Sequence, residues 1–351
     1  MKTGGGCPAG TSSEREGDMM RKVWILGLAL VLLVGLGSGV TAQQRKIVIY
    51  SALDSEVTTR VVNAFTQRTG IATEVLTLAA AGTLATRITV ERARPQADIF
   101  MGGSIDFHAP LARDGLLLAY KSPAASDPAI GKEFVDPNGF WHGWYIGALS
   151  IFYNQERLTG RAPATWDDLL DPRFRGQFVM PSPVTTGGGF IFVATQIFRL
   201  GEDRAWQWLK QLAANAQQFT PTAPAGIALV SRGEAIVGMN WGHDVQAQAR
   251  NQGFPVGLVF PPDTATEIGG VSIIKGGPNP EGAKAFVDFL MTRVPQDINA
   301  QFGLRYAVRT DSPKPMGMPD RSTMKFVKYD RAWAIENQAR IRQRWQTEIG
   351  R

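Results

Sequence analysis

A run of hydroxyl residues and glycines from Pro181 to Gly189 leads directly into an apolar stretch from Phe190 to Leu200. The apolar stretch has the length of a helix, and a helix start presents unpaired N–H groups and a partial positive charge. Glycine lets a ligand approach that backbone closely. The run therefore predicts capture of a small anion such as a phosphate, phosphonate or carboxylate, and the alternative is a threonine N-cap behind a glycine loop. The residues predicted to bind the anion are Thr185, Thr186, Gly187 and Gly188.

The sequence carries no motif that predicts catalysis. Its three histidines are His108, His142 and His243, and its one cysteine is Cys7. It contains no Gly-x-Ser-x-Gly elbow, no His-Glu-x-x-His pair and no P-loop pattern. His243 and Asp244 are adjacent, which does not give the spaced base and orienting group of a catalytic triad. We therefore expect a binding protein rather than an enzyme, with no cofactor and no resident metal.

The elements that would position these residues alternate between strands and helices in the first part of the chain. Short runs of β-branched and apolar residues indicate strands, and amphipathic runs that end at glycine or proline indicate helices. This alternation predicts an α/β fold with a parallel sheet, in which ligands sit beyond the carboxyl ends of the strands. Those ends are Ser51 to Asp54 and Gly102 to Asp106. The expected strands are 46–51, 72–78 and 97–101, and the expected helices are 56–68, 82–94 and 105–114.

The middle of the chain predicts a second set of strands and helices around the glycine run. No internal repeat or low-complexity tract occurs after residue 42, and about 300 residues are ample for one or two domains. The expected strands are 144–154, 176–180, 235–240 and 256–260, and the expected helices are 165–170, 203–215 and 226–232.

The beginning of the chain predicts a secretory signal peptide. A basic pair precedes the apolar run 23–34, and a small-residue cleavage pattern ends at Ala42, so residues 1–42 would be removed. The alternative is a membrane anchor. Because Cys7 lies ahead of the apolar run, neither a lipoprotein anchor nor a disulfide is expected. The mature protein would be soluble and either periplasmic or extracellular.

The charge of the chain is only mildly basic. Removal of residues 1–42 takes away four basic and three acidic residues, which lowers the formal charge from +6 to +5. The remaining charges are scattered rather than clustered, so binding to nucleic acid is not indicated. A mild positive field would favour anionic ligands.

Five segments, spread over nearly all of residues 45–345, carry a resemblance to a known family. They are Val48 to Ala52, Ala97 to Gly103, Trp166 to Leu169, Asn240 to Asp244, and Glu267 to Glu281. In this order they resemble the extracellular solute-binding proteins of ABC importers. The resemblance is to the two-lobed kind that includes ferric-ion, aminoethylphosphonate and sugar-phosphate binders.

The resemblance implies a periplasmic-binding-protein-like α/β fold, with two lobes joined by two crossover strands and a ligand cleft between them. The first lobe would hold residues 45–142 and 263–351, and the second would hold residues 143–262. The lobes would hinge shut over the ligand. The closed protein, expected to be a monomer, would then dock on a membrane permease.

The ferric-ion members of this family typically carry two adjacent tyrosines near the position of Trp241, with a histidine and a glutamate from the first lobe. This chain has no tyrosine from Asn240 to Asp244. Asp54 stands at the position that resembles the histidine, and Gly102 and Gly103 stand where the glutamate would be. Ferric iron is a hard cation that prefers anionic oxygen ligands, and the phenolates are missing. Ferric ion is therefore the alternative ligand.

The chain is instead similar to the sugar-phosphate branch at His243 and Asp244, which are followed by Glu267. The resemblance implies that these three residues contact the organic part of the ligand. This agrees with their chemistry, because carboxylates accept hydrogen bonds from hydroxyl groups or pair with an ammonium. Trp241 would offer a flat apolar face to a sugar ring. Ser51, from the first lobe, would complete the anion site when the cleft shuts.

Each of these residues also has a purely structural interpretation. His243 and Asp244 suit a helix start, and Glu267 suits a solvated position beside glycines. Ser51 suits a turn, and Trp241 suits core packing. The predicted function is capture of a small organic phosphate or phosphonate by cleft closure, as the binding component of an ABC transporter. Ferric-ion binding for an iron importer is the alternative.

Overall fold

The structure, a computed structural model, describes residues 1, 4–6, 46–78 and 80–350. The signal-peptide pattern and Cys7 lie outside these described residues. Residues 45–351 form one compact unit. No helix in the described part of the chain is long and apolar enough to cross a membrane.

The first lobe is built on three parallel strands. The central strand β1 (Ile47–Ser51) pairs with β2 (Thr73–Thr77) on one side and with β3 (Ile99–Ser104) on the other. These strands are rich in β-branched and apolar residues, as parallel strands between helices usually are. The predicted alternation of strands and helices is therefore confirmed here. The helices of this lobe are α2 (Ser55–Thr69), α3 (Ala81–Val90), α4 (Ile105–Arg113), α9 (Pro280–Leu290) and α10 (Arg293–Phe302).

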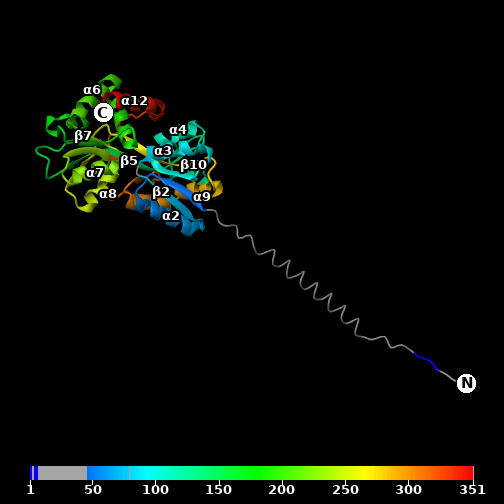
Figure 1. Cartoon of the computed structure of the whole chain (residues 1–351). Helices are drawn as coiled ribbons and strands as arrows, with labels where there is room; N and C mark the ends of the chain where they lie inside the picture. The colour runs from blue at the N-terminus through cyan, green and yellow to red at the C-terminus, as the bar shows by residue number, and fades with distance from the viewer. Residues whose placement is uncertain (2–3, 7–45, 79, 351) are drawn as a thin grey trace. The chain divides into compact units, whose positions relative to one another are not determined.

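The second lobe repeats this design with its own strands and its own apolar core. Strand β6 (Phe178–Pro181) pairs in parallel with β7 (Ala216–Thr220) and with β8 (Val237–Trp241). Phe192 and Trp206 belong to a buried core cluster separate from that of the first lobe. Figure 1 shows the second-lobe helices α6, α7 and α8 gathered apart from α2, α4 and α9. The helices of this lobe are α5 (Gly187–Leu200), α6 (Glu202–Asn215), α7 (Ala223–Ser231) and α8 (Gly242–Gln248).

One long strand, β5 (His142–Asn154), is shared by the two lobes. Its first half pairs antiparallel with β10 (Thr266–Ile274) and β11 (Tyr306–Ala307), and its second half pairs antiparallel with β8 and β9 (Val256–Val259). β5 and the β9–β10 segment therefore both pass between the lobes, which confirms the predicted fold. The strand order is β2-β1-β3-β10-β5-β8-β6-β7, and β4 (Leu117–Leu118) pairs with β10. The sheet is mixed rather than purely parallel because the crossover strands run antiparallel.

The end of β3 differs from the sequence-based expectation. The strand was expected to stop after Met101, yet it continues through Gly102 and Gly103 to Ser104. Both glycines have positive φ, 84° and 74°, which a residue with a Cβ adopts only with strain. The Ser104 side chain then accepts a hydrogen bond from the Asp106 N–H and caps α4. This turn brings Ser104 to the boundary between the lobes.

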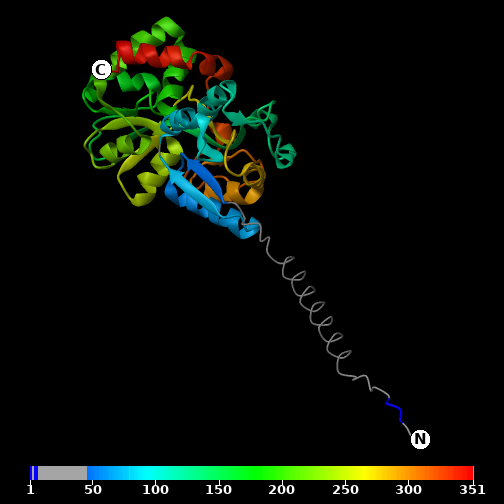
Figure 2. The same cartoon turned by 45° about the vertical axis from the view of Figure 1, so that its right-hand side comes forward.

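The C-terminal helices α11 (Arg331–Glu336) and α12 (Gln338–Glu348) pack on the second lobe. The Trp345 ring meets the Phe219 ring edge to face at 4.9 Å, and Ile341 belongs to the same core cluster. Figure 2 shows this red segment lying beside the green second-lobe helices. The lobe boundaries expected from the sequence stay a prediction, and this packing argues for counting residues 331–349 with the second lobe.

A glycine on β10 provides a test of the crossover packing. A Cβ built on Gly269 would overlap the ring of Tyr145 on the neighbouring strand β5. We expect Gly269→Ala to lower the free energy of unfolding by about 1–3 kcal/mol, because overpacking a buried site forces neighbours off their rotamers. Denaturant titration measures the loss. The same change made in a Tyr145→Ala background should cost much less, and an equal cost in both backgrounds would contradict the packing described here.

Candidate functional site

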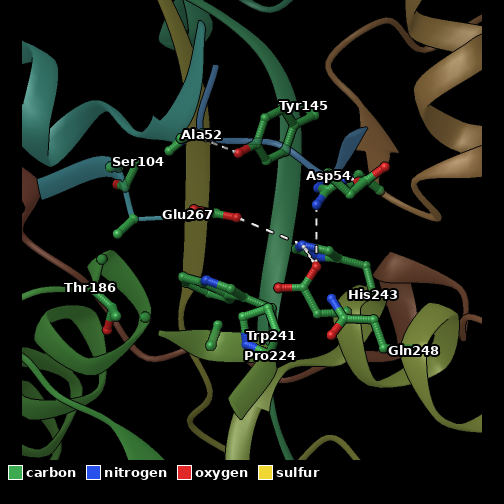
Figure 3. Close-up of a pocket in the computed structure, with 18 residues that line it drawn as sticks. Ala52, Asp54, Ser104, Tyr145, Thr186, Pro224, Trp241, His243, Gln248 and Glu267 are labelled. Atoms are coloured by element: carbon green, nitrogen blue, oxygen red, sulfur yellow. Dashed lines mark hydrogen bonds and ion pairs between the residues drawn. The ribbon is translucent and has the colours of Figure 1, made fainter. Parts of the chain in front are cut away.

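A cavity of ≈ 110 Å³ lies where the two lobes meet. Its wall contains the starts of four helices, α3, α4, α5 and α7, together with side chains from β5, β8, α8 and β10. Figure 3 places Ser104 and Thr186 on one side of this cavity and Asp54, His243 and Gln248 on the other. The two sides are called here the helix-start end and the charged end.

The helix-start end presents backbone rather than charged side chains. It is formed by the first residues of four helices from both lobes, each at least nine residues long. The partial positive charge at each helix start favours an anion, and several such starts aimed at one space add their effects. The lining residues at this end are Ala80, Ala81, Gly103, Ser104, Thr186, Gly187, Gly188, Ala223 and Pro224.

The start of α5 keeps two donors free. The Thr186 hydroxyl accepts from the Gly189 N–H at 3.1 Å, and the Thr186 carbonyl accepts from the Phe190 N–H. Among the described residues nothing accepts from the N–H groups of Gly187 and Gly188, both of which line the cavity. Thr186 is thus the N-cap that the alternative interpretation expected, and the two glycine N–H groups remain available to an anion.

Glycines also let the two lobes approach each other at this end. A Cβ built on Gly82 of α3 would lie 3.0 Å from the Thr185 carbonyl oxygen of the other lobe. A Cβ on Gly187 would lie 3.2 Å from the Phe107 ring of α4. Larger side chains at either position would hold the lobes apart, so these two glycines permit the close approach.

The charged end contains a buried guanidinium between two carboxylates. Arg305 lies immediately before β11, and one of its Nη atoms is 3.0 Å from Asp54, the N-cap of α2. The other is 3.2 Å from Asp244 on α8. The His243 Nε2 atom lies 3.4 Å from Asp244 and 4.0 Å from Glu267. Because Arg305 belongs to the first lobe and Asp244 to the second, their ion pair crosses the cleft.

Burial controls the protonation of this end. Burial raises the pKa of Asp244 to about 6 and that of Glu267 to about 8, and Arg305 opposes both shifts. Burial also lowers the pKa of His243 well below its usual value, and the nearby Arg305 acts in the same direction. Although burial disfavours the Arg305 charge, Asp244 and Asp54 hold its pKa above the ordinary value. Near neutral pH the end therefore contains an ionised Asp244–Arg305 pair beside a protonated Glu267 and a neutral His243.

Two aromatic side chains close the cavity between its ends. The Trp241 ring lies nearly parallel to the His243 ring, with an interplanar angle of 9° and centroids 6.2 Å apart. The Tyr145 hydroxyl accepts a hydrogen bond from the Gly103 N–H at 3.1 Å, which ties β5 to the start of α4. Both aromatic residues are nearly fully buried and still line the cavity. No cluster of three or more His, Cys, Asp or Glu able to hold a metal occurs in residues 46–78 and 80–350.

Seven of the nine residues predicted from the sequence line this cavity. They are Thr186, Gly187, Gly188, Trp241, His243, Asp244 and Glu267. Several of the structural alternatives hold at the same time, since Asp244 stands in the first turn of α8 and Trp241 packs in the second-lobe core. Glu267 is only 3% exposed, so its interpretation as a solvated residue is wrong.

The structure does not bring Ser51 and Thr185 to the cavity. The Ser51 hydroxyl is buried at the end of β1, where it shares a hydrogen bond with Thr58 at 2.9 Å and accepts one from the Leu53 N–H. The Thr185 hydroxyl donates instead to the Pro221 carbonyl at 2.8 Å. The Ser51 hydroxyl is thus engaged close to its own strand end, and the Thr185 hydroxyl satisfies a carbonyl 36 residues along the chain.

Other cavity residues were not selected from the sequence. Ser104 and Asp54 lie within the strand ends that were expected to face a ligand. The sequence therefore predicted their location near the site but assigned neither residue a role. Tyr145 was assigned no role from the sequence. Nothing in the sequence indicated a role for Arg305, since the two carboxylates that it pairs with, Asp54 and Asp244, lie 251 and 61 residues away along the chain.

A two-lobed α/β fold with a cavity between the lobes is a common arrangement for binding a small molecule. The family described as bacterial extracellular solute-binding protein matches residues 94–333. The chain belongs to this family, the substrate-binding components of ABC importers.

Named relatives point to different solutes. A structure of the periplasmic binding protein AfuA from Actinobacillus pleuropneumoniae, with fructose-6-phosphate bound, is 30% identical, with a TM-score of 0.82 and coverage of 87% of this chain and 98% of that one. Iron uptake protein A1 of Synechocystis is 26% identical and covers 77% of this chain and 78% of its own. A putative 2-aminoethylphosphonate-binding periplasmic protein of Salmonella paratyphi A is 27% identical, with coverage of 71% and 73%.

The raised pKa of Glu267 predicts a pH dependence of stability. Because the folded pKa, about 8, exceeds the ordinary value of 4.5 for a glutamate, the folded state holds the proton more tightly than the unfolded state. The contribution to stability is fully present below pH 4.5 and is lost as the pH rises through about 8. Glu267→Gln should therefore raise the thermal midpoint of the ligand-free protein more at the upper end of this window than at the lower end. Thermal scans across the window check this, with the exposed Glu133→Gln as the control, and a pH-independent effect of Glu267→Gln would contradict it.

Proposed function

We propose that this protein captures a small hydroxylated organic phosphate in the cavity between its lobes. The observation that carries the proposal is the convergence of four helix starts on one end of the cavity, with the free N–H groups of Gly187 and Gly188 among them. A phosphate or phosphonate group has several acceptor oxygens and a charge that such an end stabilises. No described residue places a cationic side chain at this end, so the backbone would supply the donors.

The charged end supports a ligand with hydroxyl groups over one with an ammonium. Both carboxylates nearest Arg305 are already paired with its guanidinium, at 3.0 and 3.2 Å. Glu267, protonated near neutral pH, can donate one hydrogen bond and accept others, which suits a neutral hydroxyl. An ammonium would instead meet a fixed guanidinium close by. The flat face of Trp241 would then lie against the carbon skeleton of the ligand.

Ferric-ion binding remains the second candidate, because one relative is named as an iron uptake protein. The acids at the charged end, Asp54, Asp244 and Glu267, would be the oxygen ligands. Against this, the Arg305 guanidinium stands between two of these acids and would repel a trivalent cation. Among the described residues on the cavity wall, Tyr145 carries the only phenol, and its hydroxyl accepts from the Gly103 N–H.

Calorimetric titration separates the candidates. The protein, freed of ligand by unfolding and refolding, is titrated with fructose 6-phosphate, 2-aminoethylphosphonate, inorganic phosphate and ferric citrate. We expect the sugar phosphate to bind with micromolar or tighter affinity, about −8 kcal/mol or better, and more tightly than the aminophosphonate. Binding of ferric citrate alone would overturn the proposal. Preference for the aminophosphonate would retain the anion site and overturn the assignment of the charged end.

The glycine run provides a residue-level test with a matched control. Gly187→Leu places a side chain against the Phe107 ring and over the free N–H groups, so it should weaken binding of the phosphate ester by at least about tenfold, or 1.4 kcal/mol. Thr185→Val changes the adjacent residue, whose hydroxyl faces the Pro221 carbonyl and not the cavity. It should leave the affinity within about twofold. Equal effects of the two changes would mean that this run is only structural.

A further inference from the structure

We propose that residues 329–349, called here the C-terminal clamp, stabilise the closed arrangement of the two lobes by binding the first turn of α4. The clamp is built into the second lobe and reaches the first lobe through three polar side chains, Arg331, Gln338 and Arg342. The proposal concerns the closure of the cleft and does not depend on which solute the cavity takes.

Apolar packing fixes the clamp to the second lobe. Tyr329 and Trp333 meet the ring of Phe198 on α5 at 4.9 and 5.3 Å, and Trp345 meets Phe219 at 4.9 Å. Arg340, on the outer side of α12, pairs with Glu202 at the start of α6. Loss of this packing would expose several aromatic faces to water, so the clamp should move with the second lobe.

Three polar side chains of the clamp converge on two residues of the first lobe. Arg331 pairs with the buried Asp106 carboxylate at 3.0 Å, and Gln338 donates to the Asp106 backbone carbonyl at 3.0 Å. The Arg342 guanidinium lies 4.7 Å from the centre of the neighbouring Phe107 ring. Asp106 and Phe107 both belong to the first turn of α4. Figure 2 shows the red segment reaching from the green helices toward the cyan ones.

The Arg342 side chain contacts both lobes. Its guanidinium lies between Phe107 of the first lobe and Phe190 of the second, whose ring centre is 5.4 Å away. Its Nε donates to the Pro183 carbonyl at 3.1 Å, in the turn that leads into the glycine run. A guanidinium between two aromatic faces gains a cation–π interaction with each, and that gain is largest when water is excluded. Separation of the lobes would remove the Phe107 face from the guanidinium.

The clamp is also connected to the cavity wall. Asp106 accepts a hydrogen bond from the hydroxyl of Ser104, which lines the helix-start end, through the same oxygen that faces Arg331. Arg331 donates in addition to the Thr266 carbonyl at 2.9 Å, next to the cavity residue Glu267. When the first lobe swings away, Asp106 would carry Ser104 with it and leave Arg331 behind. Opening of the cavity and release of the clamp are therefore the same event.

A distance measurement on the protein without added solute tests the clamp. Spin labels are placed at Val90→Cys on α3 and Gln207→Cys on α6, both exposed positions on different lobes, in the full chain with Cys7→Ser. The clamp variant is Arg342→Met combined with Gln338→Met, which removes both contacts and keeps unbranched side chains. Pulsed electron paramagnetic resonance should show longer distances between the two labels in the clamp variant than in the labelled wild type.

The control is Gln343→Met combined with Gln346→Met, two changes to methionine at exposed positions of the same helix. It should keep the wild-type distance distribution. Arg342→Lys, which retains the charge, should lie between the wild type and the clamp variant. Identical distributions in the clamp variant and the control would overturn the proposal, as would a shift of equal size in both. A thermal scan of each variant checks that the label shift arises in folded protein.

Because the distances are recorded without a solute, their outcome is separate from the identity of the ligand. A second readout applies to any solute that binds in the titrations. Its dissociation should be at least about tenfold faster from the clamp variant, with a much smaller change in association, because the clamp stabilises only the closed form. Slower association with unchanged dissociation would contradict this role.

Discussion

The site depends on the sharing of β5 between the two lobes. A strand of thirteen residues that pairs with β10 in its first half and with β8 in its second half leaves the sheets of both lobes joined at one line. Gly147 lies in the middle of β5, close to the point where the pairing changes from β10 to β8. A Cβ there would lie 2.6 Å from the His243 ring and 2.8 Å from the Glu267 carboxylate. The absence of a side chain on β5 therefore makes room for two polar groups from different lobes to meet above it.

The cavity has two chemically different ends, because backbone at helix starts lines one end and charged side chains line the other. Helices that begin where parallel strands end direct their free N–H groups toward the boundary, so one end is positive without any cationic side chain. The other end carries real charges, and their burial decides their state. Arg305 is retained there as a cation because two carboxylates face it, while Glu267, farther from any compensating charge, takes up a proton.

Much of the fold was within reach of the sequence because it depends on local patterns. The alternation of apolar strands with amphipathic helices, and the threonine followed by three glycines at the start of α5, are properties of neighbouring residues. The continuation of β3 through Gly102 and Gly103 was missed because a pair of glycines usually ends a strand. The packing of α12 against the second-lobe core had no signal in the sequence, because an arginine-rich helix with few apolar residues does not indicate which lobe its Ile341 and Trp345 will meet.

The sequence by itself determined which chemistry was present: a helix start rich in glycine, an adjacent His–Asp pair, and a nearby glutamate. Only the tertiary structure decided which of these groups share a cavity and which side chains neutralise one another. Arg305 lies 251 residues from Asp54 and 61 from Asp244, and no spacing rule reaches across such distances. Ser51 and Thr185 show the reverse, since their hydroxyls bond other protein groups and do not face the cavity, although their residue types and positions suited an anion site. Local propensity sets elements, whereas burial, charge compensation and contact between lobes are properties of the folded whole.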